Sequence, residues 1–105
     1  MKIIGTGRSH PSLVVTNEML SQILDTSDEW ITTRTGIKER RIISSENLED
    51  LAIDAAKKAL ADANMEAKDL DYIICANVVN EFVSPAMSCL VQGAIGANCP
   101  CFDLN

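Results

Sequence analysis

The chain has 105 residues, of which 47% are hydrophobic and 23% charged, and its 9 basic and 15 acidic side chains give a formal net charge of -6. This length suits one compact domain and excludes a complete multi-domain enzyme, while the composition excludes disordered, collagen-like and low-complexity chains. The acidic balance argues against broad binding to nucleic acid or anionic membranes, so we expect neither as a partner.

The sequence also lacks the signals that direct a chain into or across a membrane. No apolar stretch approaches the roughly 20 residues that a membrane-spanning helix needs, and the first residues lack the longer apolar run of a secretory signal. We therefore expect a soluble protein of the cytoplasm.

The N-terminal segment predicts a strand followed by a loop. Lys2-Ile3-Ile4 indicates a short buried strand, and Gly5-Thr6-Gly7 indicates the turn that ends it. The same glycines begin like a dinucleotide-binding fingerprint, but the third glycine is missing and no helix opens there. We therefore interpret them as a strand-ending turn.

Two helices are predicted before residue 37. From Thr16, apolar residues recur at helical spacing on one face, with Asn17 on the opposite, polar face. Thr26-Ser27-Asp28-Glu29 then matches a capping box with two carboxylates in the first turn. That second helix carries Trp30 and Arg34 and is expected to end near Gly36.

The middle of the chain predicts an extended segment and a long helix. Arg40 to Ser44 alternates weakly and could be an edge strand or an extended loop. A narrow alanine-rich face then runs from Leu48 to Ala63, with Asn47 as the predicted cap and Asn64 as the predicted terminator. Small side chains let a helix lie close to its neighbour, so we expect tight packing on this face.

The C-terminal part predicts strand, helix and strand. Tyr72 to Ala76 is a continuous apolar run, typical of a strand buried on both faces of a parallel sheet. Pro85 fits the first turn of a helix that runs to Gly96, and Cys101 to Leu104 indicates another buried strand. The element order predicts an α/β fold with a mostly parallel, buried sheet covered by helices. Because the chain stops just after an apolar strand, we expect residues 1–105 to be a truncated piece.

The candidate site residues lie on the second helix. Trp30 precedes Arg34 by four residues, so an indole plane and a guanidinium project side by side. Such a pair suits a nucleotide, because the indole can stack on a base while the guanidinium meets phosphates. Three further basic residues that follow, Lys38, Arg40 and Arg41, could assist. The alternative is a half-buried tryptophan packed under a solvated arginine.

The remaining reactive side chains give weaker indications. His10 stands beside Pro11 in a predicted loop without a partner for acid or base work. The cysteines are expected to be reduced and to pack as small buried hydrophobes, and no metal site is expected from one Cys-Pro-Cys and a single histidine. They are Cys75, Cys89, Cys99 and Cys101.

Two motifs resemble a known enzyme family. Asp25-Thr26-Ser27-Asp28-Glu29-Trp30-Ile31 and Arg34-Thr35-Gly36-Ile37-Lys38-Glu39-Arg40 are similar to the N-terminal signature of the β-ketoacyl-acyl carrier protein synthase III family. The opening Ile3 to Gly7, the Thr16-Asn17 helix start, Pro85 and the closing Cys99 to Asn105 also fall where that family has similar residues. The resemblance therefore covers the whole chain.

The resemblance implies a thiolase-like layered fold of which residues 1–105 form an incomplete N-terminal half domain. It implies a homodimer that condenses an acyl-CoA starter with malonyl-acyl carrier protein to initiate fatty acid synthesis, with coenzyme A thioester as substrate and no permanently bound cofactor. The family's cysteine nucleophile follows a motif like Phe102 to Asn105, and its histidine and asparagine lie further on. We therefore expect no catalytic residue in this chain, which alone would be inactive.

The resemblance also assigns binding roles. It implies that Trp30 stacks on the adenine of coenzyme A, that Arg34 brackets this base and approaches the phosphates, and that Thr26 and Thr35 add polar contacts. Many members have an aromatic residue before the proline that matches Pro85, whereas this chain has Ser84.

Two other readings stay open. One is another thiolase-fold condensing enzyme, such as a hydroxymethylglutaryl-CoA synthase or a plant-type polyketide synthase. The other is a non-catalytic α/β module that pairs through its alanine-rich helix and its sheet edges.

Overall fold

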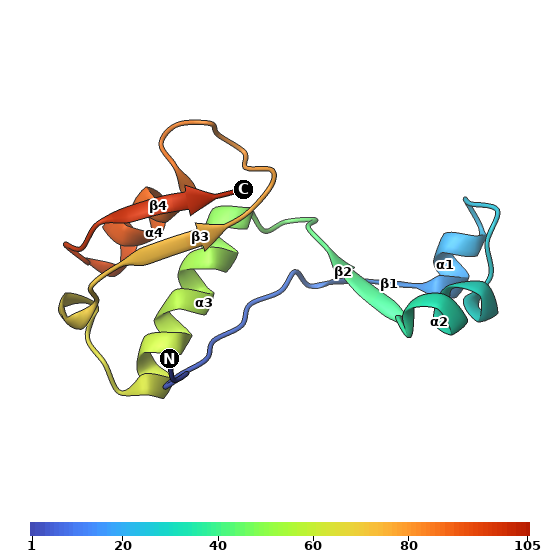
Figure 1. The fold of residues 1–105 in the computed structure, drawn as a ribbon. Coiled ribbons are helices and arrows are strands. Elements are labelled where there is room, and N and C mark those ends of the chain that lie inside the picture. The colour runs from blue at the N-terminus through green and yellow to red at the C-terminus, as the bar shows by residue number, and fades with distance from the viewer. The chain divides into compact units, whose positions relative to one another are not determined.

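A computed structural model describes residues 1–105 (Figure 1). The chain divides into two compact units, one made of residues 1–9 and 47–105 and the other of residues 10–46. None of the helices is both long enough and apolar enough to cross a bilayer.

The first unit contains a two-stranded parallel sheet covered by helices. Its elements are α3 (Leu48–Ala63), the 3-10 helix η1 (Ala67–Asp69), β3 (Ile73–Ala76), α4 (Met87–Ile95) and β4 (Cys101–Leu104). Strand β3 pairs with β4 from Ile73↔Cys101 to Ala76↔Leu104. Helix α4 lies against both strands and α3 packs on α4 (Figure 1). The predicted strand, helix and strand with parallel pairing are confirmed.

The ends of α3 follow the predicted chemistry. The side chain of Asn47 accepts a hydrogen bond from the Asp50 amide at 2.7 Å, which satisfies one free N–H of the first turn. Asn64 ends the helix in the left-handed conformation with φ 52°. Both predicted caps of this helix are confirmed.

The prediction of a strand at Lys2 to Ile4, ended by a glycine turn, is wrong. The segment is extended but forms no sheet, because no strand pairs with it, and Ile3 stays 77% exposed. The two glycines instead allow the segment to lie directly on α3. A Cβ on Gly5 would come within 2.7 Å of Ala63 Cβ, and one on Gly7 within 2.2 Å of the Ala55 carbonyl oxygen. This is the close neighbour that the alanine face predicted.

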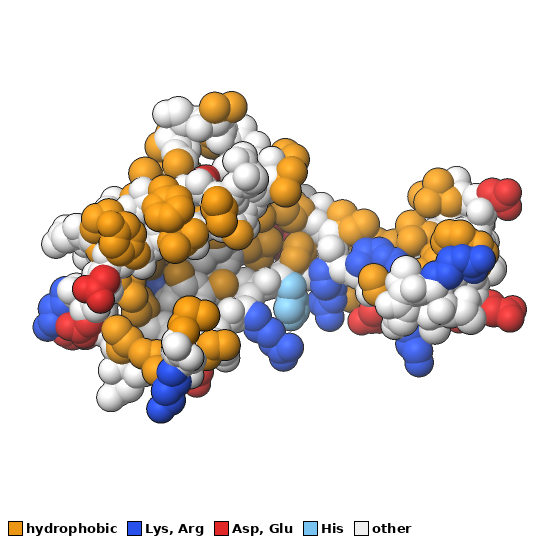
Figure 2. Space-filling view, in the orientation of Figure 1, with side chains coloured by type: hydrophobic (Ala, Val, Ile, Leu, Met, Phe, Trp, Pro, Cys, Tyr) orange, Lys and Arg blue, Asp and Glu red, His pale blue; other side chains and the backbone are white.

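The core of this unit lies beneath α4, and the other face of its sheet is open. Four hydrophobic residues are buried, namely Met87, Val91, Ala97 and Cys99. Side chains alternate along β3 and β4, so that Ile74, Phe102 and Leu104 are exposed by 58%, 44% and 58%. Figure 2 shows hydrophobic side chains gathered over this part of the molecule. The sequence predicted burial on both faces, whereas in this chain helices cover only one.

Helix α4 begins slightly later than predicted. Its N-cap is Ala86 and its first residue is Met87, so Pro85 lies just before the helix and not in its first turn. Gly96 ends the helix with φ 75°, as predicted.

The second unit contains two antiparallel strands and two short helices, and both helices lie between the strands in the sequence. Strand β1 (Leu13–Thr16) pairs with β2 (Glu39–Ile42), from Leu13↔Ile42 to Thr16↔Glu39. Helix α1 (Asn17–Ser21) follows β1 directly, and α2 (Asp28–Thr35) precedes β2. The segment predicted from Arg40 to Ser44 is thus a strand only as far as Ile42, and its partner β1 was not predicted. Helix α1 ends before Ile23, which is 78% exposed.

Asn17 is the most buried side chain of this unit, contrary to its predicted place on a polar helix face. It is 1% exposed, and its amide nitrogen donates to Asp28 Oδ1 at 2.8 Å and to the Ile37 carbonyl at 2.8 Å. Its amide oxygen accepts a 2.6 Å hydrogen bond from Arg40 Nη2. One amide therefore ties α1 to the start of α2, the loop after α2 and strand β2.

Substitution Asn17→Ala is expected to lower the free energy of unfolding of this unit by about 1–3 kcal/mol, because it removes the buried amide that joins Asp28, the Ile37 carbonyl and Arg40. Urea unfolding monitored by Trp30 fluorescence measures this, since the sole tryptophan lies in the same unit. Gln22→Ala, at an exposed position just after α1, is the control and should change stability by less than about 0.5 kcal/mol. Equal midpoints for the two variants would contradict the role of Asn17.

Candidate functional site

Helix α2 presents the predicted indole and guanidinium as a stacked pair. Its N-cap is Ser27, which accepts a hydrogen bond from the Trp30 amide at 3.1 Å, and not Thr26 as the predicted capping box requires. Gly36 ends the helix with φ 71°, as predicted. The guanidinium carbon of Arg34 lies 4.3 Å from the centroid of the Trp30 ring, which is a cation–π contact. The indole is 53% exposed, so it is not a core side chain. This geometry is also that of the alternative, a half-buried tryptophan beneath a solvated arginine, so the binding role of the pair stays a prediction.

A shallow hollow lies beside this pair. Its lining includes Ser27, Glu29, Trp30, Thr33 and Arg34, all from α2 and its cap. Arg34 supplies the positive charge and Glu29 a carboxylate, so a phosphate would be favoured only on the arginine side of the hollow. An exposed aromatic face next to a guanidinium can hold a flat base together with a phosphate.

The two threonines predicted for the site differ in what their hydroxyls do. Thr26 Oγ1 is shielded from solvent and has no hydrogen-bond partner in the chain. Thr35 Oγ1 donates to the Ile31 carbonyl at 2.8 Å and accepts from the Ile37 amide at 3.0 Å. Thr26 therefore keeps an unused polar group next to α2, whereas Thr35 already closes the end of the helix.

The other basic residues of the segment do not join Arg34 as a single cluster. Arg40 donates to the Val15 carbonyl at 3.1 Å and to Asn17, so its guanidinium is committed to holding the unit together. Arg41, the next residue of β2, points to the opposite face of the strand and reaches the Pro11 carbonyl at 3.4 Å. Lys38 lowers the pKa of Asp28, although the hydrogen bonds from Asn17 and Thr32 lower it more. These contacts disfavour the predicted assistance from Arg40, which stays a prediction.

A second polar cluster forms around Asp103 at the end of β4. Its carboxylate accepts hydrogen bonds from the backbone amides of Met87 at 2.9 Å and Ser88 at 2.8 Å, at the start of α4. It also accepts from the side-chain amides of Asn77 at 3.1 Å and Asn80 at 3.0 Å. One carboxylate thus fixes the start of α4 and the loop between β3 and α4. No sequence pattern pointed to this role.

The pKa of Asp103 reflects these contacts. Burial of the carboxyl group raises its pKa, but the hydrogen bonds from Ser88, Asn77 and Met87 outweigh that effect and hold the pKa well below its usual range. Asp103 is therefore a carboxylate at neutral pH and acts as the N-terminal anion of α4.

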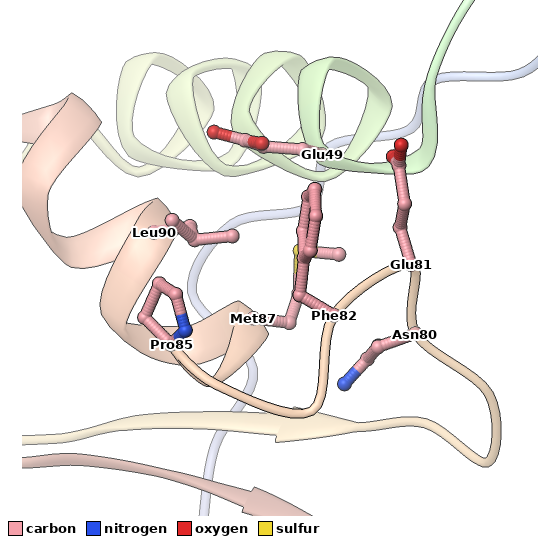
Figure 3. A pocket seen from close by; sticks show the side chains of 7 residues that line it. All are labelled: Glu49, Asn80, Glu81, Phe82, Pro85, Met87 and Leu90. Carbon is pink, nitrogen blue, oxygen red and sulfur yellow. The ribbon is translucent and has the colours of Figure 1, made fainter.

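The loop that Asp103 holds forms one wall of a small pocket between α3 and α4. Phe82 points toward α3, and Met87 and Leu90 face it from α4, as Figure 3 shows. Glu49 and Glu81 lie at its edge (Figure 3). This pocket contains no nucleophile and no acid–base pair.

The cysteines are free thiols, but only Cys99 is buried, and Cys89 is exposed. The prediction that all four are buried hydrophobes is therefore wrong, because α4 turns Cys89 away from the core. His10 is exposed and contacts only the carbonyl of the adjacent Pro11, at 3.4 Å. No three potential metal ligands come together in the chain.

The chain is similar over its whole length to condensing enzymes of fatty acid and polyketide synthesis. Beta-ketoacyl-[acyl-carrier-protein] synthase III of Clostridium acetobutylicum is 51% identical over 106 residues, covering 100% of this chain and 33% of that protein. The crystal structure of 3-oxoacyl-[acyl-carrier-protein] synthase III from Aquifex aeolicus VF5 matches with a TM-score of 0.91 and 50% identity, covering 98% of this chain and 34% of that one.

A more distant structure has the same fold. The priming beta-ketosynthase from the R1128 polyketide biosynthetic pathway matches with a TM-score of 0.89 and 30% identity, covering 98% of this chain and 31% of that one. No protein-family model matches the chain. The chain spans about a third of the length of the relatives it matches, and it has the thiolase-like α/β fold of their N-terminal part.

Substitution Asp103→Asn is expected to reduce the acid sensitivity of the first unit. The folded pKa of Asp103 lies below its unfolded value of about 3.9, so its stabilisation is complete above that pH and is lost as the pH falls further. The variant lacks this titration and should unfold at a less pH-dependent denaturant concentration, and it should be less stable than the native chain at pH 7. Urea unfolding at several pH values, monitored by far-UV circular dichroism, measures both effects.

The control is Asp71→Asn, which removes a carboxylate at an exposed position outside the helices and strands. It should keep the acid sensitivity of the native chain. An Asp103→Asn chain with the native pH dependence would show that this carboxylate does not stabilise the fold.

Proposed function

We propose that this chain, which corresponds over its whole length to the N-terminal third of β-ketoacyl-[acyl-carrier-protein] synthase III, supplies the coenzyme A entrance of such an enzyme. The observation that carries the proposal is the exposed Trp30 ring with the Arg34 guanidinium on its face. The reaction would transfer an acyl group from acyl-CoA and condense it with malonyl-acyl carrier protein, as the first step of fatty acid synthesis.

The physical support comes from the chemistry of the ligand. Adenine is a flat aromatic ring that stacks on an indole, and the coenzyme carries phosphates that a guanidinium binds in a bidentate manner. Arg34 is free to do so, because its only hydrogen bond within the chain is a long one, at 3.5 Å, to the Trp30 carbonyl. The hydroxyl of Thr26 has no partner but is shielded from solvent and does not line the hollow, so its contact with the nucleotide would require the side chain to rotate outward. Thr35 would contribute less, because its hydroxyl already makes two hydrogen bonds.

The chain would bind and position substrate without performing the chemistry. Covalent acyl transfer requires a nucleophile activated by a neighbouring base and an oxyanion site, and no such constellation forms among the described side chains. The reacting groups would come from the part of the relatives' length that this chain does not span. In this proposal residues 1–105 form an incomplete half domain of a cytoplasmic homodimer.

The open face of the β3–β4 sheet supports an incomplete half domain. Ile74, Phe102 and Leu104 lie side by side on adjacent strands and are exposed. A parallel sheet is normally covered on both faces, because its strands carry apolar side chains on both. We propose that the rest of the enzyme covers this face.

The test is a chimera in which this chain replaces the matching third of the Clostridium acetobutylicum relative, with binding measured by calorimetry. Trp30→Ala should weaken binding of coenzyme A by about 1–3 kcal/mol through the loss of base stacking. Arg34→Ala should weaken it as well, and Arg34→Lys should restore only part of the loss, because an ammonium cannot bind a phosphate in a bidentate manner.

Two controls make the test specific. Arg41→Ala removes an exposed arginine of the same unit that lies outside the hollow, and it should leave affinity unchanged. Adenosine 3′,5′-bisphosphate should lose affinity for the Trp30 and Arg34 variants, whereas pantetheine should not. The proposal fails if the chimera condenses acyl-CoA with malonyl-acyl carrier protein while both variants bind coenzyme A as tightly as the parent chimera.

A further inference from the structure

Two cysteine side chains lie next to each other on the surface of the first unit. The hollow beside Trp30 belongs to the second unit and is distant from them in the sequence. Cys89 belongs to α4 and Cys101 begins β4, and their sulfur atoms lie 3.4 Å apart. Cys89 is exposed, and Cys101 is partly exposed. The proposed function uses neither thiol.

The two thiols are held together by the packing of their elements. Helix α4 lies against β4, and Asp103, two residues after Cys101, binds the backbone at the start of α4. The far end of α4 is also fixed to the segment before β4, because Gln92 Nε2 donates to the Cys99 carbonyl at 2.6 Å. The thiols therefore stay close without a covalent bond, and disulfide formation would shorten the sulfur–sulfur distance from 3.4 Å to about 2.05 Å.

We propose that Cys89 and Cys101 form a dithiol site that is oxidised to an intramolecular disulfide by low-molecular-weight disulfides of the glutathione type. The Cys89 thiolate attacks one sulfur of the incoming disulfide, which breaks its S–S bond, forms a mixed disulfide and releases one thiolate. Cys101 then gives its proton to water and attacks Cys89 Sγ, which releases the second thiolate. Two protein thiols are oxidised and one external disulfide is reduced to two thiols.

The order of the two steps follows from the surroundings of each sulfur. The contact with Cys89 and partial burial raise the pKa of the Cys101 thiol, so Cys101 stays protonated and reacts poorly with an external disulfide. Cys89 is the exposed partner and meets the oxidant first. The second step is intramolecular, so the mixed disulfide should not accumulate.

The other two cysteines lack this arrangement. Cys99 is buried, with 8% exposure, and is shielded from an external disulfide. Cys75 is partly exposed, but the polar atom near its sulfur is the Asn77 side-chain amide, at 3.5 Å, and not a thiol. Cys75 is therefore the natural control.

The experiment exposes the reduced full chain to glutathione disulfide under native conditions, blocks the remaining thiols and maps the linkages by peptide mass spectrometry. We expect the loss of two of the four titratable thiols and a link between the peptides that contain Cys89 and Cys101. Cys101→Ser should trap the glutathione adduct on Cys89, Cys89→Ser should abolish the fast reaction, and Cys75→Ser should behave as the native chain does.

The linkage map of the native chain keeps the test valid even if a variant fails to fold. A stable glutathione adduct on Cys89 in the native chain, or a link that involves Cys75 or Cys99 at similar yield, would overturn the proposal. In denaturant all four thiols should react without preference. This control shows whether the preference for the Cys89–Cys101 link depends on the folded structure. The outcome is independent of coenzyme A binding, so it cannot be confused with failure of the proposed function.

Discussion

The buried amide of Asn17 is the interaction on which the unit of residues 10–46 depends. The four buried hydrophobic residues of the chain all lie in the other unit, and α2 itself buries no residue. The smaller unit therefore has no apolar core that could fix α2 against β1 and β2. Its place is taken by a polar junction in which Asn17 binds Asp28, the Ile37 carbonyl and Arg40. A buried polar group is stabilising only when its partners are all present, so this junction admits few alternative arrangements. Because Asn17 holds α2 at its first residue, Asp28, the rest of the helix is free to present Trp30 and Arg34 to solvent.

Local signals in the sequence predicted local structure well, and contacts between distant residues explain what they missed. The caps of α3 and the glycine that ends α2 depend on neighbouring residues only, and all were predicted. Asn17 follows Thr16 in a helical pattern, which placed it on a solvent face, since nothing nearby shows that Arg40 will reach it. Gly5 and Gly7 suggested a turn, because the sequence does not reveal that α3 comes within contact distance of their backbone. For the site, the four-residue spacing correctly predicted the pairing of Trp30 with Arg34, whereas the position of Asp103 among four donors was not predictable.

Asp103 and Asn17 each hold distant segments of their unit together through hydrogen bonds, but one is charged and the other is neutral. Asp103 is an anion that gathers neutral donors at the positive end of α4, so the helix dipole and the hydrogen bonds both favour its charge. Asn17 is a neutral amide that donates a hydrogen bond to the Asp28 carboxylate and accepts one from the Arg40 guanidinium, so it joins the two charged groups without adding a charge. Each connects segments that are far apart in the sequence. In the first unit this connection also shapes the loop that carries Phe82, whose apolar side chain closes the pocket beside α4 (Figure 3).

The distribution of positive charge explains how an acidic chain could bind a phosphate-bearing ligand. With a net charge of -6, long-range attraction of an anion is absent, and at physiological ionic strength fields fade beyond about 8 Å in any case. Recognition must then depend on contact, where one guanidinium in the correct orientation has more effect than several scattered charges. Arg40 is held in place by its hydrogen bonds to Val15 and Asn17, which hold its guanidinium against β1 and α1. Arg34 remains, and the Trp30 ring beneath it orients its plane while leaving its outer edge open to solvent. Selectivity for a base joined to a phosphate would then come from the fixed geometry of this pair and not from the overall charge of the protein.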